Sequence, residues 1–144
     1  MVLQRYMWCR THEDIVRRSM MSWLQSWLSK RSPWVFENSK IPVWLSKIAP
    51  IEIYAISFAC FVFCRETLSK TTRRHETIHY HQQLELLFVG FWTLYVLFYL
   101  RGLLRHRNGK EAYRNNPFES EAYDNERKMK YLERRQFWAW RAYV

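Results

Sequence analysis

The sequence contains little glycine and proline, with three Gly and four Pro among 144 residues. Tight turns depend on these residue types, so their scarcity argues against a fold made of many short hairpins and favours long helices. Hydrophobic residues make up 49% of the chain and aromatic residues 18%, which excludes a disordered protein. We therefore expect one compact unit of mainly α structure with a small β element, an α+β fold.

Cysteine is also scarce, with Cys9, Cys60 and Cys64 as the three examples. An odd number without a regular spacing argues against the disulfide framework of a small secreted domain and favours a reducing compartment. Cys60 and Cys64 could join His as metal ligands, but their apolar, strand-like surroundings favour buried thiols. The segment from Met1 to Met20 lacks the apolar core of a signal peptide. These features predict an intracellular protein.

Acidic residues are outnumbered, with 13 Asp and Glu against 23 Lys and Arg, and the net charge is +10. A basic chain can bind nucleic acid or an anionic membrane surface, and net charge alone does not separate the two. The mixture of cationic and aromatic residues would allow stacking on nucleic-acid bases. No nucleic-acid-binding motif accompanies it, so nucleic acid is disfavoured as a partner and an anionic membrane surface is kept as a candidate.

Residues 1–50 are predicted to form an amphipathic helix followed by a Pro-containing linker. From Thr11 to Lys30, Trp and Leu recur at helical spacing beside basic residues, which fits a helix packed on the domain or one lying in a membrane interface. From Ser32 to Pro50 we expect irregular structure with short helical turns. The stretch from Ile51 to Cys64 is rich in β-branched and aromatic residues and predicts two short strands with a bend near Ser57, or one bulged strand.

A helix with Ser69 as its N-cap would carry the sequence HETIH at residues 75–79, which is an HExxH motif. Residues four apart lie on the same face of a helix, so His75 and His79 can bind one metal ion. Glu76 would lie close enough to take a proton from a metal-bound water without being a ligand. Two neutral His, one oxygen ligand and an open water position are typical of catalytic rather than structural zinc.

The helical pattern continues into an uncharged run from Leu86 to Leu100. A membrane-spanning helix needs about 20 apolar residues, whereas a run of roughly 10 to 14 more often forms a core helix. Trp92, Tyr95 and Tyr99 lie inside the run rather than only at its ends, which argues against a simple span. A helix that is apolar on all sides still requires a cover. We expect residues 84–104 to contact a membrane or a partner helix, with burial in the core as the alternative.

The last part of the chain is predicted to be a turn-rich polar connection followed by a helix. The connection covers His106 to Asn116. Asn116 and Pro117 suit the N-cap and the first position of a helix that we expect to run through Glu133. A basic, Trp-rich tail follows, and it is a second candidate for membrane contact.

A zinc peptidase site requires a third protein ligand. Position 85 is Glu85, which excludes the HExxHxxGxxH arrangement. His81 would point to the far side of its helix, and His106 lies in the turn-rich connection without a fixed frame. The strongest candidate is Glu119, which opens the sequence ESEA at residues 119–122.

An HExxH helix followed by an ExEA helix resembles the gluzincin-type metallopeptidases, over about Ile51 to Glu126. The resemblance implies a zincin-like metal-binding domain, residues 51–144, with one Zn²⁺ ion held by His75, His79 and Glu119 and with Glu76 as general base. It also implies that an edge strand before the HExxH helix binds the substrate backbone as an added strand. The pattern HExxH-xx-Gln is also similar to that of short HExxH proteins of bacteria and their phages.

The match to this family includes Ala122, a small residue that would let the two helices approach closely. It departs from the family at Tyr123, where many members have Asp or Asn. As an alternative to metal binding, Glu119 could fold back as part of a capping box. Glu121 and Glu126 could be solvated or could pair with basic residues of the same helix.

These features predict a small, membrane-associated zinc metallopeptidase that acts on a peptide or protein substrate. Glu76 would accept a proton from the zinc-bound water and return it to the leaving amine. Tyr113 and Tyr123 are the nearest candidates for stabilising the oxyanion. The alternative is a non-catalytic zinc protein at a membrane surface, in which the metal joins two helices and the aromatic and basic surfaces bind a partner.

Overall fold

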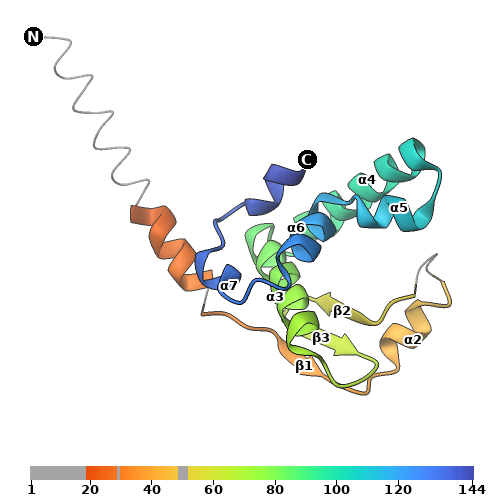
Figure 1. The fold of residues 1–144 in the computed structure, drawn as a ribbon, viewed down its shortest axis with the longest axis horizontal. Coiled ribbons are helices and arrows are strands. Elements are labelled where there is room, and N and C mark those ends of the chain that lie inside the picture. The colour runs from red at the N-terminus through yellow and green to blue at the C-terminus, as the bar shows by residue number, and fades with distance from the viewer. Residues whose placement is uncertain (1–18, 29, 49–51) are drawn as a thin grey trace, which may run out of the picture.

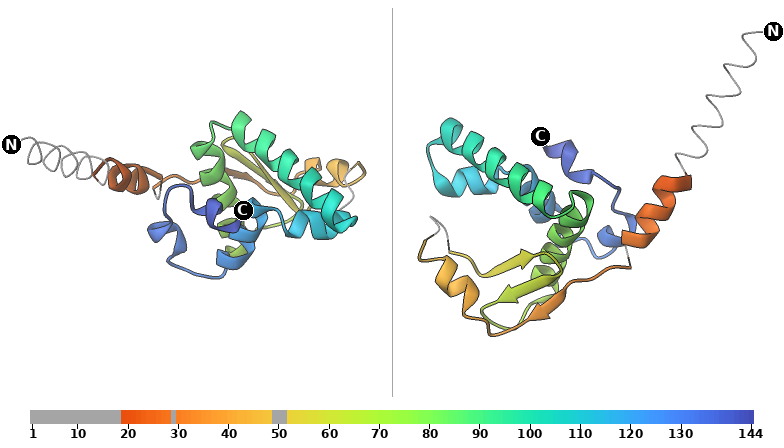
Figure 2. Two further views of the ribbon diagram at one scale, coloured as in Figure 1. Left: turned by 90° about the horizontal axis from the view of Figure 1, so that it is seen from above. Right: turned by 180° about the vertical axis from the view of Figure 1, so that it is seen from behind.

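The computed structural model describes residues 19–28, 30–48 and 52–144, and it combines a small sheet with a larger set of helices (Figure 1). This arrangement confirms the predicted α+β class. Residues 19–28 form a helix that extends away from the sheet and the other helices (Figure 2). Cys9 and residues 11–18 of the predicted amphipathic helix lie outside the described residues.

The sheet has three strands in the order β1 (Trp34–Phe36), β3 (Phe61–Cys64) and β2 (Ala55–Phe58). β2 and β3 are antiparallel and are joined by a two-residue turn formed by Ala59 and Cys60. The prediction of two short strands with a bend is therefore confirmed. β2 lies at the free edge of the sheet.

Two residues beside the sheet have a left-handed backbone. The φ of Ala59, in the β2–β3 turn, is +54°, and the φ of Asn38, which follows β1, is +58°. The segment from Ser32 to Pro50 was expected to be irregular with short helical turns; the strand β1 corrects this expectation, whereas the short helix α2 (Ile41–Leu45) agrees with it. β1 is only three residues long and pairs with β3 in parallel, from Trp34 opposite Phe61 to Phe36 opposite Phe63. A strand this short is fixed by its distant partner and shows no alternation of its own.

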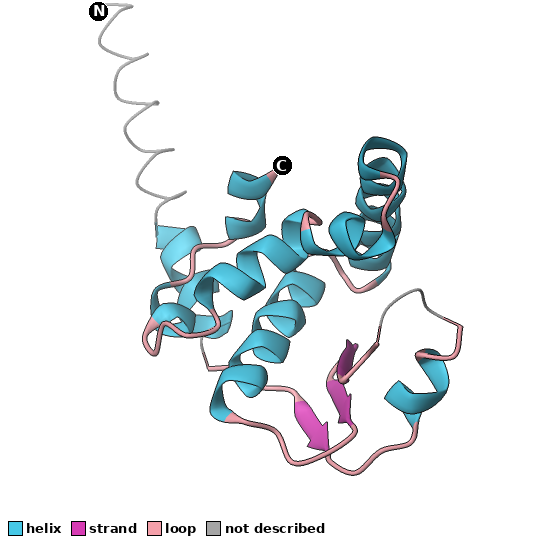
Figure 3. Cartoon of the chain, turned by 45° about the vertical axis from the view of Figure 1, so that its right-hand side comes forward, coloured by secondary structure: helices cyan, strands magenta, loops and turns pink. Residues whose placement is uncertain are grey.

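The helix α3 (Lys70–Glu85) carries the HExxH motif through the middle of the molecule. Its N-cap is Ser69, as expected, and the Ser69 hydroxyl accepts a hydrogen bond from the backbone N–H of Thr72 at 3.0 Å. Figure 3 shows α3 between the strands and the later helices. Gln83 ties α3 to the sheet because its side-chain amide donates to the carbonyl of Ser57 at 3.1 Å and accepts from the N–H of Ala59 at 2.8 Å.

A sharp break follows α3 and separates it from α4 (Val89–His106). Leu87 and Phe88 have φ angles of 51° and 57°, and the two helices are bent by 112°. No Gly or Pro marks this break in the sequence, and it was not predicted. Within the described residues, no single helix is long and apolar enough to cross a membrane, whereas α3 and α4 taken together pass by length and composition as a bent pair.

The remaining elements are α5 (Gly109–Arg114), α6 (Pro117–Asn125), α7 (Tyr131–Arg134) and a 3₁₀ helix, η1 (Ala139–Tyr143). The expected cap at Asn116 is confirmed, since its side chain accepts from the N–H of Phe118 at 3.2 Å. The helix ends at Asn125 and not at Glu133, so its predicted length is wrong. The Asn125 amide donates to the carbonyl of Glu121 at 2.7 Å, and the chain then turns back toward α6. The stretch expected to be a turn-rich connection contains α5, which is a second correction.

An aromatic core holds α4, α6 and η1 together. Phe91, Phe118 and Trp140 are buried at its centre, and further aromatic residues of α4 pack around them. The ring centroids of Phe91 and Phe118 are 4.7 Å apart, and those of Phe118 and Trp140 are 4.9 Å apart. The Trp-rich tail therefore contributes at least Trp140 to the core. This packing fixes α6 against α3 and brings Glu119 to the HExxH motif.

Candidate metal centre

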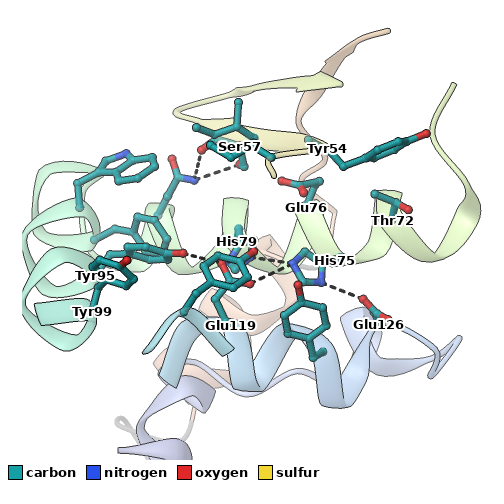
Figure 4. Close-up of a pocket in the computed structure, with 18 of the residues that line it drawn as sticks. Tyr54, Ser57, Thr72, His75, Glu76, His79, Tyr95, Tyr99, Glu119 and Glu126 are labelled. Atoms are coloured by element: carbon teal, nitrogen blue, oxygen red, sulfur yellow. Dashed lines mark hydrogen bonds and ion pairs between the residues drawn. The ribbon is translucent and has the colours of Figure 1, made fainter. Parts of the chain in front are cut away.

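His75, His79 and Glu119 converge at one point between α3 and α6. The Nε2 atoms of the two His are 3.1 Å apart. Glu119 reaches both rings, with Oε2 at 3.4 Å from Nε2 of His75 and Oε1 at 3.4 Å from Nε2 of His79. All three side chains are buried, and their ligand atoms lie within 4.8 Å of one another. Figure 4 shows the three side chains pointing toward one another. This group could hold a metal ion.

The other ring nitrogen of each His is bonded to an oxygen acceptor. Nδ1 of His75 lies 2.9 Å from Oε2 of Glu126 (Figure 4), and Nδ1 of His79 lies 2.8 Å from Oε1 of Gln82. The Gln82 amide nitrogen donates to the carbonyl of Phe118 and to Glu121, so its oxygen is left as the acceptor. Each Nδ1 therefore carries the proton, and each Nε2 presents a lone pair to the centre.

The donor set fits a divalent cation. Two imidazole lone pairs and a carboxylate face one another, and Oε2 of Glu119 is buried without a hydrogen-bond partner. A positive charge at this point would satisfy all three groups. In the protein without metal, burial alone would lower the pKa of His79, but the adjacent Glu119 carboxylate outweighs it and raises that pKa to about 9. Burial would raise the pKa of Glu119, but the two His outweigh it and hold that pKa below its usual range. Two His and one carboxylate are a common catalytic zinc ligand set.

Glu76 lies beside this group but is not part of it. Its side chain is buried and lines the same cavity as the three ligands. In Figure 4 it lies between the HExxH helix and the residues Tyr54 and Ser57. Burial raises the pKa of Glu76 and the charges of His79 and His75 only partly offset that effect. A raised pKa makes a carboxylate a stronger base, so Glu76 can accept a proton from a molecule bound at the centre.

Three tyrosines surround the centre. The Tyr95 hydroxyl donates to Oε1 of Glu119 at 2.8 Å. The Tyr123 ring packs edge-on against His75, with 4.8 Å between centroids, and Tyr113 packs against Tyr123 at 6.4 Å. Burial and then the Glu119 charge raise the pKa of both Tyr95 and Tyr113, so these hydroxyls remain protonated donors. The predicted Tyr113 and Tyr123 thus lie at the centre, and Tyr95 is an additional residue.

The centre opens into a cavity of about 570 Å³. The cavity is lined by the edge strand β2, by α3, by α6 and by aromatic residues of α4. These aromatic residues are Phe91, Trp92, Tyr95 and Tyr99. A cavity that joins an unpaired strand edge to buried metal ligands can bind an extended peptide.

The other candidate residues lie elsewhere. His81 faces away from the centre, as expected, with Nε2 3.0 Å from the carbonyl oxygen of Arg31, and His106 lies near Glu111 at 3.6 Å. Cys64 is buried, as predicted, but Cys60 is exposed because it occupies the β2–β3 turn. Neither thiol is among the metal-binding group of the described residues.

Glu121 and Glu126 are paired, but not with basic residues of their own helix. Glu126 supports His75, and its position seven residues after Glu119 places it two turns further along the same face. That spacing is a signal that could have identified Glu126 in the sequence. Glu121 is buried and binds Gln82, Tyr131 and Arg135. Tyr95 gives no comparable signal, because its approach to Glu119 depends on the break between α3 and α4.

Comparison with known proteins gives no family: the chain matches no family model, no curated protein and no solved structure. The resemblance of the motifs to gluzincin-type metallopeptidases therefore stays a prediction.

Glu126→Gln is expected to weaken metal binding by roughly tenfold or more, because a neutral amide supports the His75 imidazole less well than a carboxylate does. Asp124→Asn is the matched control, since Asp124 is exposed on the same helix. The measurement is metal affinity by competition with a chromophoric chelator. Equal affinities for the two variants would show that Glu126 does not support the ligand.

Proposed function

We propose that the chain is a zinc-dependent metallopeptidase. The observation that supports it most is the placement of Glu76, a buried carboxylate outside the ligand group, in the same cavity as His75, His79 and Glu119. A structural site has no use for a free carboxylate beside its ligands, whereas hydrolysis requires a base at that position. Zn²⁺ is the ion that such a ligand set most often binds in hydrolases.

The residues of the chain have distinct roles in this proposal. His75, His79 and Glu119 would hold the ion, and Zn²⁺, when bound, would supply Lewis acidity toward the scissile carbonyl and lower the pKa of water. Glu76 accepts the proton of the attacking water and returns it to the leaving amine. Tyr123, which touches His75, is the better placed oxyanion donor, because the Tyr95 hydroxyl already donates to Glu119.

The substrate would bind as an extended segment along β2. The edge of this strand is unpaired among the described residues, and residues 55–57 line the cavity. Gln83 holds the strand in place through Ser57 and Ala59. Because α4 lines the cavity with aromatic residues, we expect a preference for apolar side chains near the scissile bond.

A second candidate function is a non-catalytic metal site. The ligands come from two helices, α3 and α6, so a bound ion would also join these helices. In that case the metal would stabilise the fold and no substrate would be cleaved.

The test is metal content and hydrolysis of an unstructured protein by the purified full-length chain. We expect one zinc ion per chain, together with cleavage that a chelator stops and added Zn²⁺ restores. His79→Ala and Glu119→Ala should lose both the ion and the activity, whereas His106→Ala and Glu133→Ala should keep both. A chain that binds no metal would refute any metal function, and a stoichiometric ion without cleavage would favour the non-catalytic site.

A further inference from the structure

The helix α4 is apolar on two sides, but the described residues cover only one of them. Its inner side packs into the aromatic core and lines the cavity, through residues such as Phe91, Trp92 and Tyr95. Its outer side is exposed. Figure 2 shows α4 at the edge of the molecule, with open space beyond it.

The exposed side is a continuous aliphatic stripe, which we call the outer stripe. Leu87, Val89 and Leu104 are exposed by 81%, 78% and 83%, and three further members are about half exposed. The three further members are Val96, Leu97 and Leu100. Val96, Leu97, Leu100 and Leu104 lie on one face of the helix, and Val89 lies on the same face two turns before Val96. A patch this apolar on one helix marks an interaction surface.

The charge at the C-terminal end of the outer stripe is mainly positive, and the nearest following acidic residue is Glu111, whose carboxylate lies 3.6 Å from His106. Residues 86–110 contain no Asp or Glu. Arg101, Arg105, Arg107 and Lys110 lie at the C-terminal end of the stripe, and all four side chains are exposed. None of them forms an ion pair with a described residue in the structure. The stripe therefore ends in four uncompensated positive charges.

This combination decides among the candidate partners. A second copy of the chain could cover the aliphatic side chains, but it would leave the four cations of each copy without anionic partners, and each copy carries a net charge of +10. A nucleic acid would satisfy the cations but would leave the aliphatic side chains without a cover. An anionic lipid surface satisfies both, because its acyl region covers the stripe and its headgroups meet the arginines.

We infer that the outer stripe of α4 docks the protein on an anionic lipid bilayer, with α4 lying in the interface and Arg101 and Arg105 at the headgroups. The inner side of the same helix forms the aromatic wall of the cavity, so docking would hold the cavity close to the bilayer surface. This inference stands apart from the proposed peptidase activity, since it depends on no metal ligand.

The test is sedimentation of the full chain with vesicles of phosphatidylcholine containing phosphatidylglycerol, compared with phosphatidylcholine alone. We expect binding to the anionic vesicles that weakens as salt is raised. Leu97→Gln, Leu100→Gln and Leu104→Gln together should reduce it by roughly tenfold or more. Leu104→Gln alone should also weaken it, whereas Met129→Gln should not, although Met129 is 82% exposed.

Arg101→Gln with Arg105→Gln should reduce anionic binding by about fivefold for each arginine. Arg127→Gln with Arg134→Gln removes the same net charge from exposed positions elsewhere and should have a smaller effect. Binding that is unchanged in both the triple and the Leu104→Gln variants would overturn the inference. Equal binding to neutral and anionic vesicles would also overturn it. The same holds if the chain proves to self-associate and the leucine variants convert it to monomers. Vesicle binding is measured without metal or substrate. A failure to bind vesicles therefore leaves the peptidase proposal intact, and a failure of the peptidase proposal leaves the membrane inference intact.

Discussion

Glu76→Gln is expected to keep one metal ion per chain and to lose hydrolysis by a factor of about 10² to 10⁴. Glutamine has nearly the same shape as glutamate but cannot accept the proton of the attacking water. The ligand group His75, His79 and Glu119 does not include Glu76, so the ion should stay in place. Removing a carboxylate whose pKa is raised by burial should also leave the fold stable or make it more stable.

The measurement pairs metal analysis with initial rates on the same unstructured protein substrate. Glu133→Gln serves as the control, since Glu133 is exposed and distant in sequence from the motif. Full metal content with lost turnover would support a catalytic base. Unchanged turnover in Glu76→Gln would remove Glu76 from the mechanism, and loss of the ion would instead place it among the ligands.

Arg135→Met is expected to destabilise the fold by about 3 to 5 kcal/mol, which is a large part of the stability of a typical domain. The Arg135 guanidinium is buried between two carboxylates, Glu85 and Glu121. Its Nε donates to Oε1 of Glu121 at 2.6 Å, and its Nη1 donates to Oε1 of Glu85. Burial alone would lower the pKa of Arg135, but Glu121 and Glu85 outweigh it and raise that pKa. Without the cation, two buried carboxylates would remain uncompensated.

Chemical denaturation gives the free energy of unfolding, and Arg134→Met is the matched control because Arg134 is the exposed neighbour. Arg135→Lys should fall between the wild type and Arg135→Met, since lysine keeps the charge but cannot bind both carboxylates with a planar fork. If Arg135→Met does not fold, Arg135→Lys still provides the comparison. If Arg134→Met and Arg135→Lys were both as stable as the wild type, the contacts of Arg135 with the two carboxylates would not stabilise the fold.

The Arg135→Lys variant also tests the metal centre. Glu121 also accepts from Gln82, and Gln82 bonds to His79, so a continuous set of hydrogen bonds joins the C-terminal segment to a ligand. Arg135→Lys is therefore expected to weaken metal binding as well as folding.

The sequence by itself was sufficient for the parts of the protein that depend on local spacing. A spacing of four positions from His75 to His79 places both on one face of any α-helix, and Ser69 and Asn116 fix the starts of α3 and α6 by capping. The β-rich stretch before α3 indicated a hairpin, because such side chains favour strands over helices. Each of these features follows from residues within a few positions of one another.

Only the tertiary structure decided the rest. The break at Leu87 and Phe88, the strand β1 and the bonds of Glu126 and Tyr95 all depend on residues far apart in the chain. A backbone with positive φ at non-glycine residues is retained only where the surrounding structure compensates its strain, and here Leu86 and Phe91, on either side of the break, pack into the aromatic core. Glu121 illustrates the same point, since its burial is tolerated only because Arg135, fourteen residues later, returns to neutralise it. Spacing determined which side chains could share a face, and packing determined which of them meet.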